Sequence, residues 1–215
     1  MDPVICPSIL APDAQQYRSQ IEKVASFADR VQIDLTDGQF ANPKTILPDE
    51  AWWPVGIKAD FHLMYSQPDK AVDVILEHQP HMIIVHAEAR GNFASFSNIC
   101  HRKGVKIGVA VLPKTPIESI FSALQGIDHV LIFSGDLGSF GGHANLDLLN
   151  RVQHLKHQKP GLEVGWDGGI NEQNISRLAS GGVDVFNVGG YIQNSSQPEQ
   201  AYAVLQRIAD ETGTT

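Results

Sequence analysis

Three polar side chains alternate with apolar ones along the segment Val31–Gly38, whose sequence is VQIDLTDG. Because successive side chains of a strand point to opposite faces, Gln32, Asp34 and Thr36 are expected to share one face. A second carboxylate, Asp167, ends another apolar run later in the chain. Two carboxylates on opposite faces of a bound substrate can act as general acid and general base. Asp34 and Asp167 are therefore the candidate catalytic pair, although a structural carboxylate is an equal alternative for Asp34 alone.

Several histidines and one further aspartate lie close to these positions in the sequence. His62 ends a third apolar run and could add a metal bond or a hydrogen bond at the same site. Asp37 directly precedes Gly38, and the Asp-Gly pair is typical of a turn, so we interpret it as a turn residue rather than a catalyst. His86 and His143 are interpreted as hydrogen-bonded groups at the rim or surface rather than as ligands.

Glycine-rich segments follow three successive apolar runs near the end of the chain. They are Gly135–Gly142, Gly168-Gly169 and Gly189-Gly190. Glycine lets the backbone approach a ligand closely and turn its N–H groups toward an anion. Any one of these segments could be only a turn. Together they predict a phosphate-binding site formed by backbone amides.

Eight short apolar runs alternate with amphipathic stretches of helical length. The expected strands are Val4–Ser8, Arg30–Asp34, Ile57–His62, Met82–His86, Lys106–Val111, His129–Phe133, Glu163–Asp167 and Val185–Val188. The expected helices are Ala14–Phe27, Pro68–His78, Phe93–Arg102, Pro116–Leu124, Leu146–Lys156, Asn171–Ala179 and Pro198–Asp210. The segment Thr36–Val55 is weakly patterned, and we expect a long loop with at most a short helix.

This alternation predicts parallel β/α units within one α/β domain that covers residues 1–215. Eight such units fit a compact (β/α)8 TIM barrel, whose active site lies at the C-terminal ends of the strands. An open doubly wound sheet is the alternative, because periodicity does not show whether the sheet closes.

The composition excludes some partners. A net charge of −8, without a basic stripe, argues against binding to nucleic acid, whereas backbone amides can still bind a small anion. Cys6 and Cys100 have no CxxC spacing, so they are expected to be reduced and structural. No apolar run approaches the length of a membrane span or a signal peptide. These features predict a cytoplasmic protein without a nucleic-acid or membrane partner.

Six motifs occur together, in order, along nearly the whole chain. They are Cys6–Leu10, Gln32–Gly38, Asp60–Met64, Phe140–Gly142, Asp167–Asn171 and Gly181–Gly190. In this combination the chain resembles the ribulose-phosphate 3-epimerase family. Single motifs also occur in other phosphate-binding barrels, so the resemblance depends on the combination.

The resemblance implies a (β/α)8 barrel that interconverts D-ribulose 5-phosphate and D-xylulose 5-phosphate, usually as a homo-oligomer. It implies that Asp34 and Asp167 move the C3 proton through an enediolate. A divalent metal, zinc, iron or manganese, would be held by Asp34, His62 and Asp167, with position 32 as the fourth ligand. The resemblance further implies phosphate contacts at Gly141, Gly142, Gly168, Gly169, Gly189 and Gly190, and substrate contacts at Ser8 and Met64.

The sequence departs from the family pattern at informative places. Gln32 replaces a histidine, and an amide oxygen is a poorer zinc ligand than an imidazole, which makes the fourth ligand doubtful. Thr36 and Phe133 replace methionines of the apolar cap. The loop Ser134–His143 is one residue longer than the family loop.

These departures leave other functions open. One is a sugar-phosphate-binding paralogue without turnover, and another is an epimerase of a related ketose phosphate such as a hexulose 6-phosphate. An aldolase or decarboxylase of the same barrel class is less favoured. The chain has no obvious lysine at a strand end for a Schiff base, and no Asp-x-Lys-x-x-Asp signature.

Overall fold

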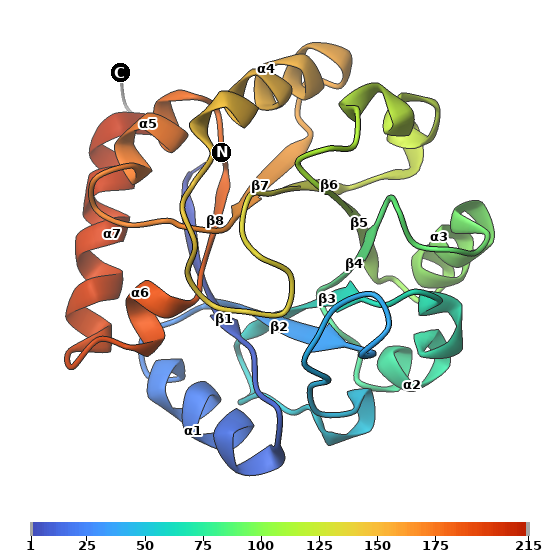
Figure 1. The fold of residues 1–215 in the computed structure, drawn as a ribbon, viewed down its shortest axis with the longest axis horizontal. Coiled ribbons are helices and arrows are strands. Elements are labelled where there is room, and N and C mark those ends of the chain that lie inside the picture. Colours follow the sequence, from blue (N-terminus) through green and yellow to red (C-terminus); the bar gives the residue numbers. More distant parts are fainter. Residues whose placement is uncertain (1, 214–215) are drawn as a thin grey trace.

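A closed barrel of eight parallel strands forms the centre of the molecule, in a computed structural model that describes residues 2–213. Neighbouring strands follow one another in sequence, and β1 pairs with β8 to close the sheet. Figure 1 looks down the barrel, with the helices arranged around its outside. The strands are β1 Val4–Ile9, β2 Arg30–Thr36, β3 Lys58–Met64, β4 Met82–His86, β5 Lys106–Val111, β6 His129–Phe133, β7 Glu163–Asp167 and β8 Val185–Val188.

The (β/α)8 prediction is thereby confirmed, and the open sheet is excluded. The expected bounds of the last five strands are those observed. The α-helices are α1 Ala14–Val24, α2 Val72–Glu77, α3 Phe93–Arg102, α4 Leu149–Gln158, α5 Ile175–Ser180, α6 Gly190–Gln193 and α7 Pro198–Gly213. The 3₁₀ helices are η1 Pro48–Glu50, η2 Pro68–Lys70, η3 Ile117–Gly126 and η4 Leu146–Leu148.

Several helical segments differ from the prediction. The helices expected over Pro68–His78 and Leu146–Lys156 each begin with a 3₁₀ helix, η2 and η4. The helix expected over Pro116–Leu124 is the 3₁₀ helix η3, whose buried residues are Ile117, Ile120 and Leu124. The short helix α6, which directly follows the Gly189-Gly190 segment, was not expected. Among residues 2–213, no helix combines the length and the apolar character that crossing a bilayer would need.

The interior of the barrel is divided into an apolar and a polar part. The side chains of Met82, Ile84, Ala110 and Leu131 form a separate buried apolar cluster on strands β4 to β6. The polar part forms two layers. One layer is near the start of the strands, and the other contains the candidate catalytic residues at their C-terminal ends.

The lower polar layer is a buried network of charges around Arg30. Its Nε donates to Asp60 Oδ2 at 2.6 Å, and its terminal nitrogens donate to the two Glu163 oxygens at 3.0 and 2.9 Å. His129 Nδ1 lies 2.8 Å from Glu163 Oε1. Burial raises the pKa of Asp60 to about 6 even beside Arg30. This layer joins β2, β3, β6 and β7 through charges that have little access to water.

Replacing Arg30 with methionine is expected to lower the free energy of unfolding by about 3–5 kcal/mol, because Asp60 and Glu163 would lose their buried counter-charge. The matched control is Arg207→Met, whose guanidinium lies 3.7 Å from Glu211 with both side chains 66% exposed. An exposed pair of this kind contributes about 1 kcal/mol or less. Denaturant unfolding of the two variants checks the difference, and equal losses would contradict this role for Arg30.

The loop after β2 is attached to the end of β3 by Asp37. Its Oδ1 accepts hydrogen bonds from the backbone N–H groups of Gln39 at 2.8 Å and Phe40 at 2.7 Å. Its Oδ2 accepts one from the N–H of Ser66 at 2.7 Å. These bonds lower the pKa of Asp37 although burial opposes them. Asp37 is thus a turn residue, and its bonds hold the strand end that carries Asp34.

Candidate active site

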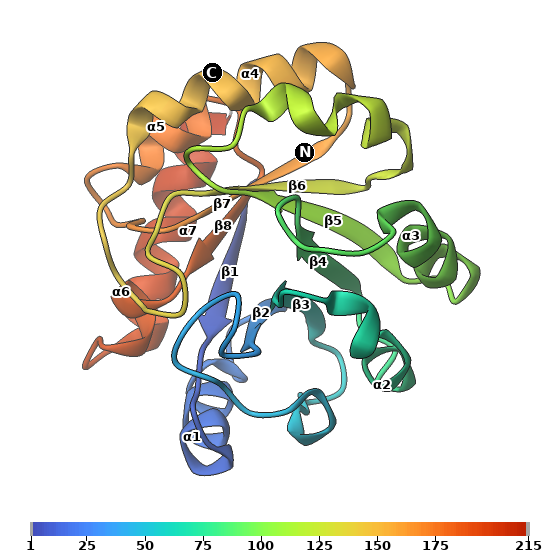
Figure 2. The same ribbon diagram turned by 45° about the vertical axis from the view of Figure 1, so that its right-hand side comes forward.

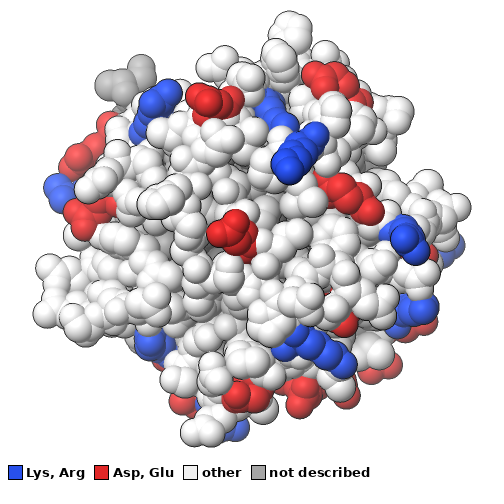
Figure 3. Space-filling model, viewed as in Figure 1, with Lys and Arg blue, Asp and Glu red and all other residues white. Residues whose placement is uncertain are grey.

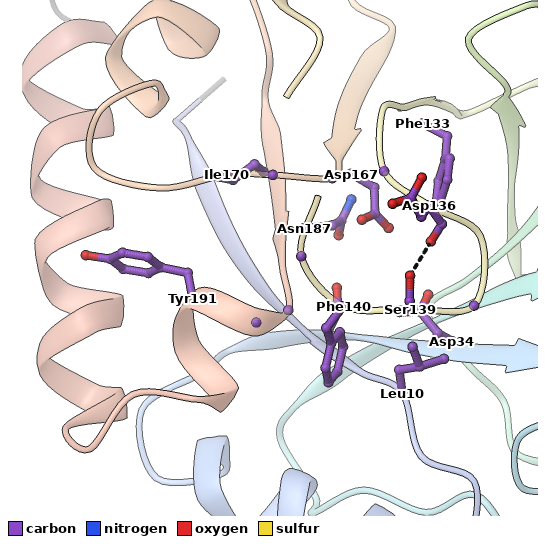
Figure 4. Close-up of a pocket in the computed structure, with 18 of the residues that line it drawn as sticks. Leu10, Asp34, Phe133, Asp136, Ser139, Phe140, Asp167, Ile170, Asn187 and Tyr191 are labelled. Atoms are coloured by element: carbon purple, nitrogen blue, oxygen red, sulfur yellow. Dashed lines mark hydrogen bonds between the residues drawn. The ribbon is translucent and has the colours of Figure 1, made fainter. Parts of the chain in front are cut away.

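The two candidate catalytic carboxylates meet inside the C-terminal end of the barrel. Asp34 comes from β2 and Asp167 from the last position of β7, and Figure 4 shows both beside the cavity. The amide nitrogen of Gln32 lies between them, 2.9 Å from Asp34 Oδ1 and 2.6 Å from Asp167 Oδ2. His62, which pairs in register with Asp34, places Nδ1 at 2.8 Å from Asp34 Oδ1. The structure thus brings the three predicted polar strand ends into one cluster.

The ring of His62 contacts the buried His86, which in turn lies beside the half-buried Glu88. His62 Nε2 lies 2.9 Å from His86 Nε2, and His86 Nδ1 lies 3.4 Å from Glu88 Oε2. Burial opposes the ionised form of Glu88, but His86, Thr115 and the N–H of Leu112 bring its pKa down to about 2. The ring of His62 therefore lies with Nε2 toward His86 and Nδ1 toward Asp34.

A proton or a metal ion can lie between His62 Nδ1 and Asp34 Oδ1. A nitrogen lone pair and a carboxylate oxygen repel each other at 2.8 Å, unless a proton or a metal ion lies between them. One ligand atom each from Asp34, His62 and Asp167 lies within 4.8 Å of the others. Imidazole nitrogen and carboxylate oxygens are ligands that divalent zinc, iron and manganese accept. Three of the four predicted positions therefore carry side chains of the types that such an ion accepts.

Gln32, the fourth position of the predicted metal set, does not offer a ligand atom to the site as the other three residues do. Gln32 is fully buried and directs its N–H groups, not its oxygen, toward the carboxylates. Its Oε1 has no hydrogen-bond partner among residues 2–213. As oriented, the amide cannot act as a ligand, since an amide nitrogen that carries two protons has no lone pair to donate.

The environment of Asp167 favours proton transfer near neutral pH. Burial and the neighbouring charge of Asp34 raise the pKa of the Asp167 carboxyl to about 7. Both of its protonation states are then accessible near neutral pH, as a group that takes up and returns a proton requires. Burial lowers the pKa of His86 to about 4, which keeps that ring neutral.

A cavity opens above the carboxylates, between the loops that follow β6, β7 and β8 (Figure 4). It contains most of the positions predicted for substrate and phosphate. Its lining residues include Ser8, Asp34, Met64, Phe133, Phe140, Gly141, Asp167, Gly168, Gly169, Asn187, Gly189 and Gly190. Gly142 is next to this lining without being part of it, and Gln32 and His62 are buried beneath it.

Glycine is required where the loops after β6 and β7 touch. A Cβ atom on Gly168 would lie 2.1 Å from the nitrogen of Gly135, and one on Gly169 would lie 2.2 Å from the nitrogen of Ala144. Both glycines also have positive φ angles, of 113° and 70°. Within residues 2–213, the backbone N–H groups of Gly141 and Gly169 form no hydrogen bond, so they are available to an anion.

Two buried polar atoms beside the cavity also lack partners. Ser8 Oγ and Asn187 Nδ2 form no hydrogen bond with any described residue, although both side chains are nearly inaccessible. Buried polar groups normally have partners, so these atoms are candidates to bind hydroxyl groups of a ligand. Asn187 was not predicted, but its register with Asp167 places it on the same inner face of the barrel.

The interpretation of His86 as a rim or surface group is wrong. It is almost completely buried, and its ring packs 4.7 Å from that of Phe40 and 5.8 Å from that of Phe133. The reason is that the last position of β4 points into the barrel, and two aromatic side chains cover it. Glu88, which lies beside His86, comes two residues after the end of β4.

The face that contains the barrel mouth carries no basic cluster at its centre. Figure 3 shows the lysine and arginine side chains of this face away from the middle, where an acidic side chain is exposed. In Figures 1 and 2 the loop that follows β6, drawn in yellow, crosses over this mouth. In that loop Ser139 Oγ donates to the backbone oxygen of Asp136 at 3.2 Å, as Figure 4 shows. An anion in this cavity would therefore be bound mainly by backbone amides.

Comparisons with known proteins agree with this geometry. Residues 4–193 match the model of the "Ribulose-phosphate 3 epimerase family". The chain belongs to this family. The ribulose-phosphate 3-epimerase of Mycobacterium leprae (strain TN) is 34% identical to it over 217 residues, which cover 97% of this chain and 96% of that protein. The protein of the same name from Schizosaccharomyces pombe is 26% identical and covers 94% and 92% of the two chains.

Membership in the ribulose-phosphate 3-epimerase family confirms the resemblance that the motifs indicated. It also confirms the prediction that the protein is a carbohydrate-phosphate epimerase. A solved structure of 3-keto-L-gulonate-6-phosphate decarboxylase from Vibrio cholerae O1 biovar El Tor aligns with a TM-score of 0.74. It covers 99% of both chains but is only 14% identical, so it is evidence for the barrel fold alone.

Proposed function

We propose that this protein inverts C3 of a ketopentose 5-phosphate and interconverts D-ribulose 5-phosphate and D-xylulose 5-phosphate. The observation that carries the proposal is the pairing of Asp34 with Asp167 beneath a cavity bordered by glycine loops. Membership in the family supports the same reaction.

The reaction requires a proton to leave one face of C3 and a proton to return to the other. One aspartate takes the C3 proton as a base, and the C–H electron pair moves toward the C2 carbonyl to give an enediolate. The other aspartate then gives its proton to the opposite face of C3. Since Asp34 and Asp167 come from strands β2 and β7, they can approach the substrate from two sides. The sugar need not turn over.

The residues Asp34, His62 and Asp167 would hold the divalent metal ion, with zinc, iron and manganese as the candidates. When bound, such an ion supplies positive charge beside the developing enediolate. His86 and Glu88 orient the His62 ring so that Nδ1 faces the carboxylates. Gln32 offers no ligand atom in its present orientation.

The remainder of the cavity would bind the sugar phosphate. The phosphate would lie on backbone amides at Gly141, Gly142, Gly168, Gly169, Gly189 and Gly190. Ser8 and Asn187 would bind substrate hydroxyl groups through atoms that have no protein partner, while Met64 forms part of the apolar wall. A homo-oligomer and a cytoplasmic location stay predictions.

A coupled assay on D-ribulose 5-phosphate tests the proposal, with Zn²⁺, Fe²⁺, Mn²⁺ or no added metal. Formation of D-xylulose 5-phosphate is the expected result. Hexulose 6-phosphates are assayed in parallel. If the protein turns over only these compounds, its substrate is a hexulose phosphate rather than a pentulose phosphate. Calorimetric binding of the phosphate ester without turnover under any metal would identify a binding protein instead.

A further inference from the structure

The side chain of Gln32 fills the space between the two proposed acid–base carboxylates. Its Nε2 atom donates one N–H to Asp34 Oδ1 and the other to Asp167 Oδ2, at 2.9 and 2.6 Å. The bond to Asp34 lies within strand β2, and the bond to Asp167 connects β2 with β7 across 135 residues of sequence. One amide group thus bridges the catalytic pair.

The carboxylates fix the orientation of this amide. If its oxygen and nitrogen were exchanged, Oε1 would face Asp167 Oδ2 at 2.6 Å and Asp34 Oδ1 at 2.9 Å, and a proton on Asp167 would relieve only one of these two contacts. Three oxygen acceptors so close to one another repel. The observed orientation is favoured even though it leaves Oε1 buried without a partner in the described part of the chain.

A metal ion and the amide would compete for the same place. An ion held by Asp34 and Asp167 needs oxygen atoms that Gln32 now engages as a hydrogen-bond donor. Metal binding would require the amide to turn, and its buried N–H groups would lose their acceptors. An unsatisfied buried donor is unfavourable, so this change opposes metal binding.

We propose that Gln32 is a positioning residue that holds Asp34 and Asp167 in place without a metal ion, so that the epimerase remains active after metal is removed. The inference rests on the proposed function of the same site. Two N–H donors offset the repulsion between the carboxylates, as a cation would. Ser8 Oγ and Asn187 Nδ2, which are buried beside the cavity without partners, would then stabilise the enediolate oxygens.

The test compares chelator-treated protein, checked by elemental analysis, with the same protein supplied with Zn²⁺ or Mn²⁺. The chelated wild type is expected to keep its turnover number within about threefold of the metal-supplied rate. Gln32→Met keeps a side chain of similar length but removes both donors. Its chelated form is expected to lose about 10²-fold in kcat with little change in KM, because the carboxylates would be misplaced.

A second readout is metal binding itself, measured by calorimetric titration with Zn²⁺ and Mn²⁺. Gln32→His is expected to bind Zn²⁺ at least about tenfold more tightly than the wild type. The matched control is Gln193→Met, which changes another buried glutamine with an unpartnered Oε1 and an Nε2 that donates to the backbone oxygen of Ser8 at 3.2 Å. A merely structural glutamine would change stability without changing the response to the chelator.

The outcomes separate this inference from the proposed function. If the chelated wild type is inactive and metal restores it, the role of Gln32 is wrong and the epimerase function stands. If chelated Gln32→Met is as active as the chelated wild type, the positioning role is also wrong. Inactivity of the wild type with every metal and without metal would overturn both proposals.

Discussion

Replacing Asp34 or Asp167 with asparagine is expected to reduce the interconversion of the two pentulose phosphates by about 10²–10⁴-fold. Asparagine keeps the shape of the side chain and an oxygen that can accept from Gln32, but it cannot take up the C3 proton. Binding of the phosphate ester should change little, since the glycine loops are not altered. Initial rates and calorimetric titration of the same preparations check the two expectations.

Asp37→Asn is the matched control for this loss. Asp37 lies three residues beyond Asp34, and its carboxylate accepts from backbone N–H groups, two in the turn and one from Ser66 after β3. We expect its activity to stay within about threefold of the wild type while stability falls by about 1 kcal/mol. A loss in Asp37→Asn equal to that in Asp34→Asn would attribute the effect to the loop rather than to the catalytic carboxylate.

Replacing Gly169 with alanine is expected to weaken phosphate-ester binding by about 10- to 100-fold, the effect of losing one or two charge-assisted hydrogen bonds. The added methyl carbon would lie 2.2 Å from the nitrogen of Ala144 and 2.5 Å from the carbonyl carbon of His143. The backbone of the β6 loop must therefore move away from the β7 loop. That movement would separate the amides proposed to bind the phosphate.

Gly104→Ala controls for the backbone strain in this experiment. Gly104 has a φ of 74°, close to the 70° of Gly169, but a Cβ atom there would meet nothing within 4 Å. We expect a loss of stability of about 1 kcal/mol and unchanged binding of the ester. Calorimetric titration of both variants with the substrate phosphate gives the comparison. Equal affinities would show that the contact at Gly169 does not shape the phosphate site.

The alternation of apolar and polar residues was sufficient to predict parallel β/α units and the residues of the central cluster. In β2 every second side chain is polar, and a strand inside a barrel must direct those side chains into its interior. The positions of Asp34, His62 and Asp167 at strand ends then bring them to one rim. The pattern did not show that neighbouring strands pair in parallel or that the sheet closes into a barrel, and the structure shows both.

The parts that could not be predicted depend on contacts between distant residues. His86 is buried because Phe40 and Phe133 cover it, and neither residue is near it in sequence. The orientation of the Gln32 amide depends on two carboxylates from different strands. The resemblance identified Gln32 as a replaced metal ligand, but only the geometry shows that it donates to the catalytic pair.

The central claim is that Asp34 and Asp167 act on opposite faces of C3. Its most direct test is deuterium incorporation from heavy water into each epimer separately, measured by NMR for Asp34→Asn and Asp167→Asn. In each variant one base remains, and it can exchange the C3 proton only on its own face. We therefore expect no interconversion, with each variant labelling one epimer and the two variants labelling different ones. Labelling of the same epimer by both variants, or full interconversion in either, would contradict the account.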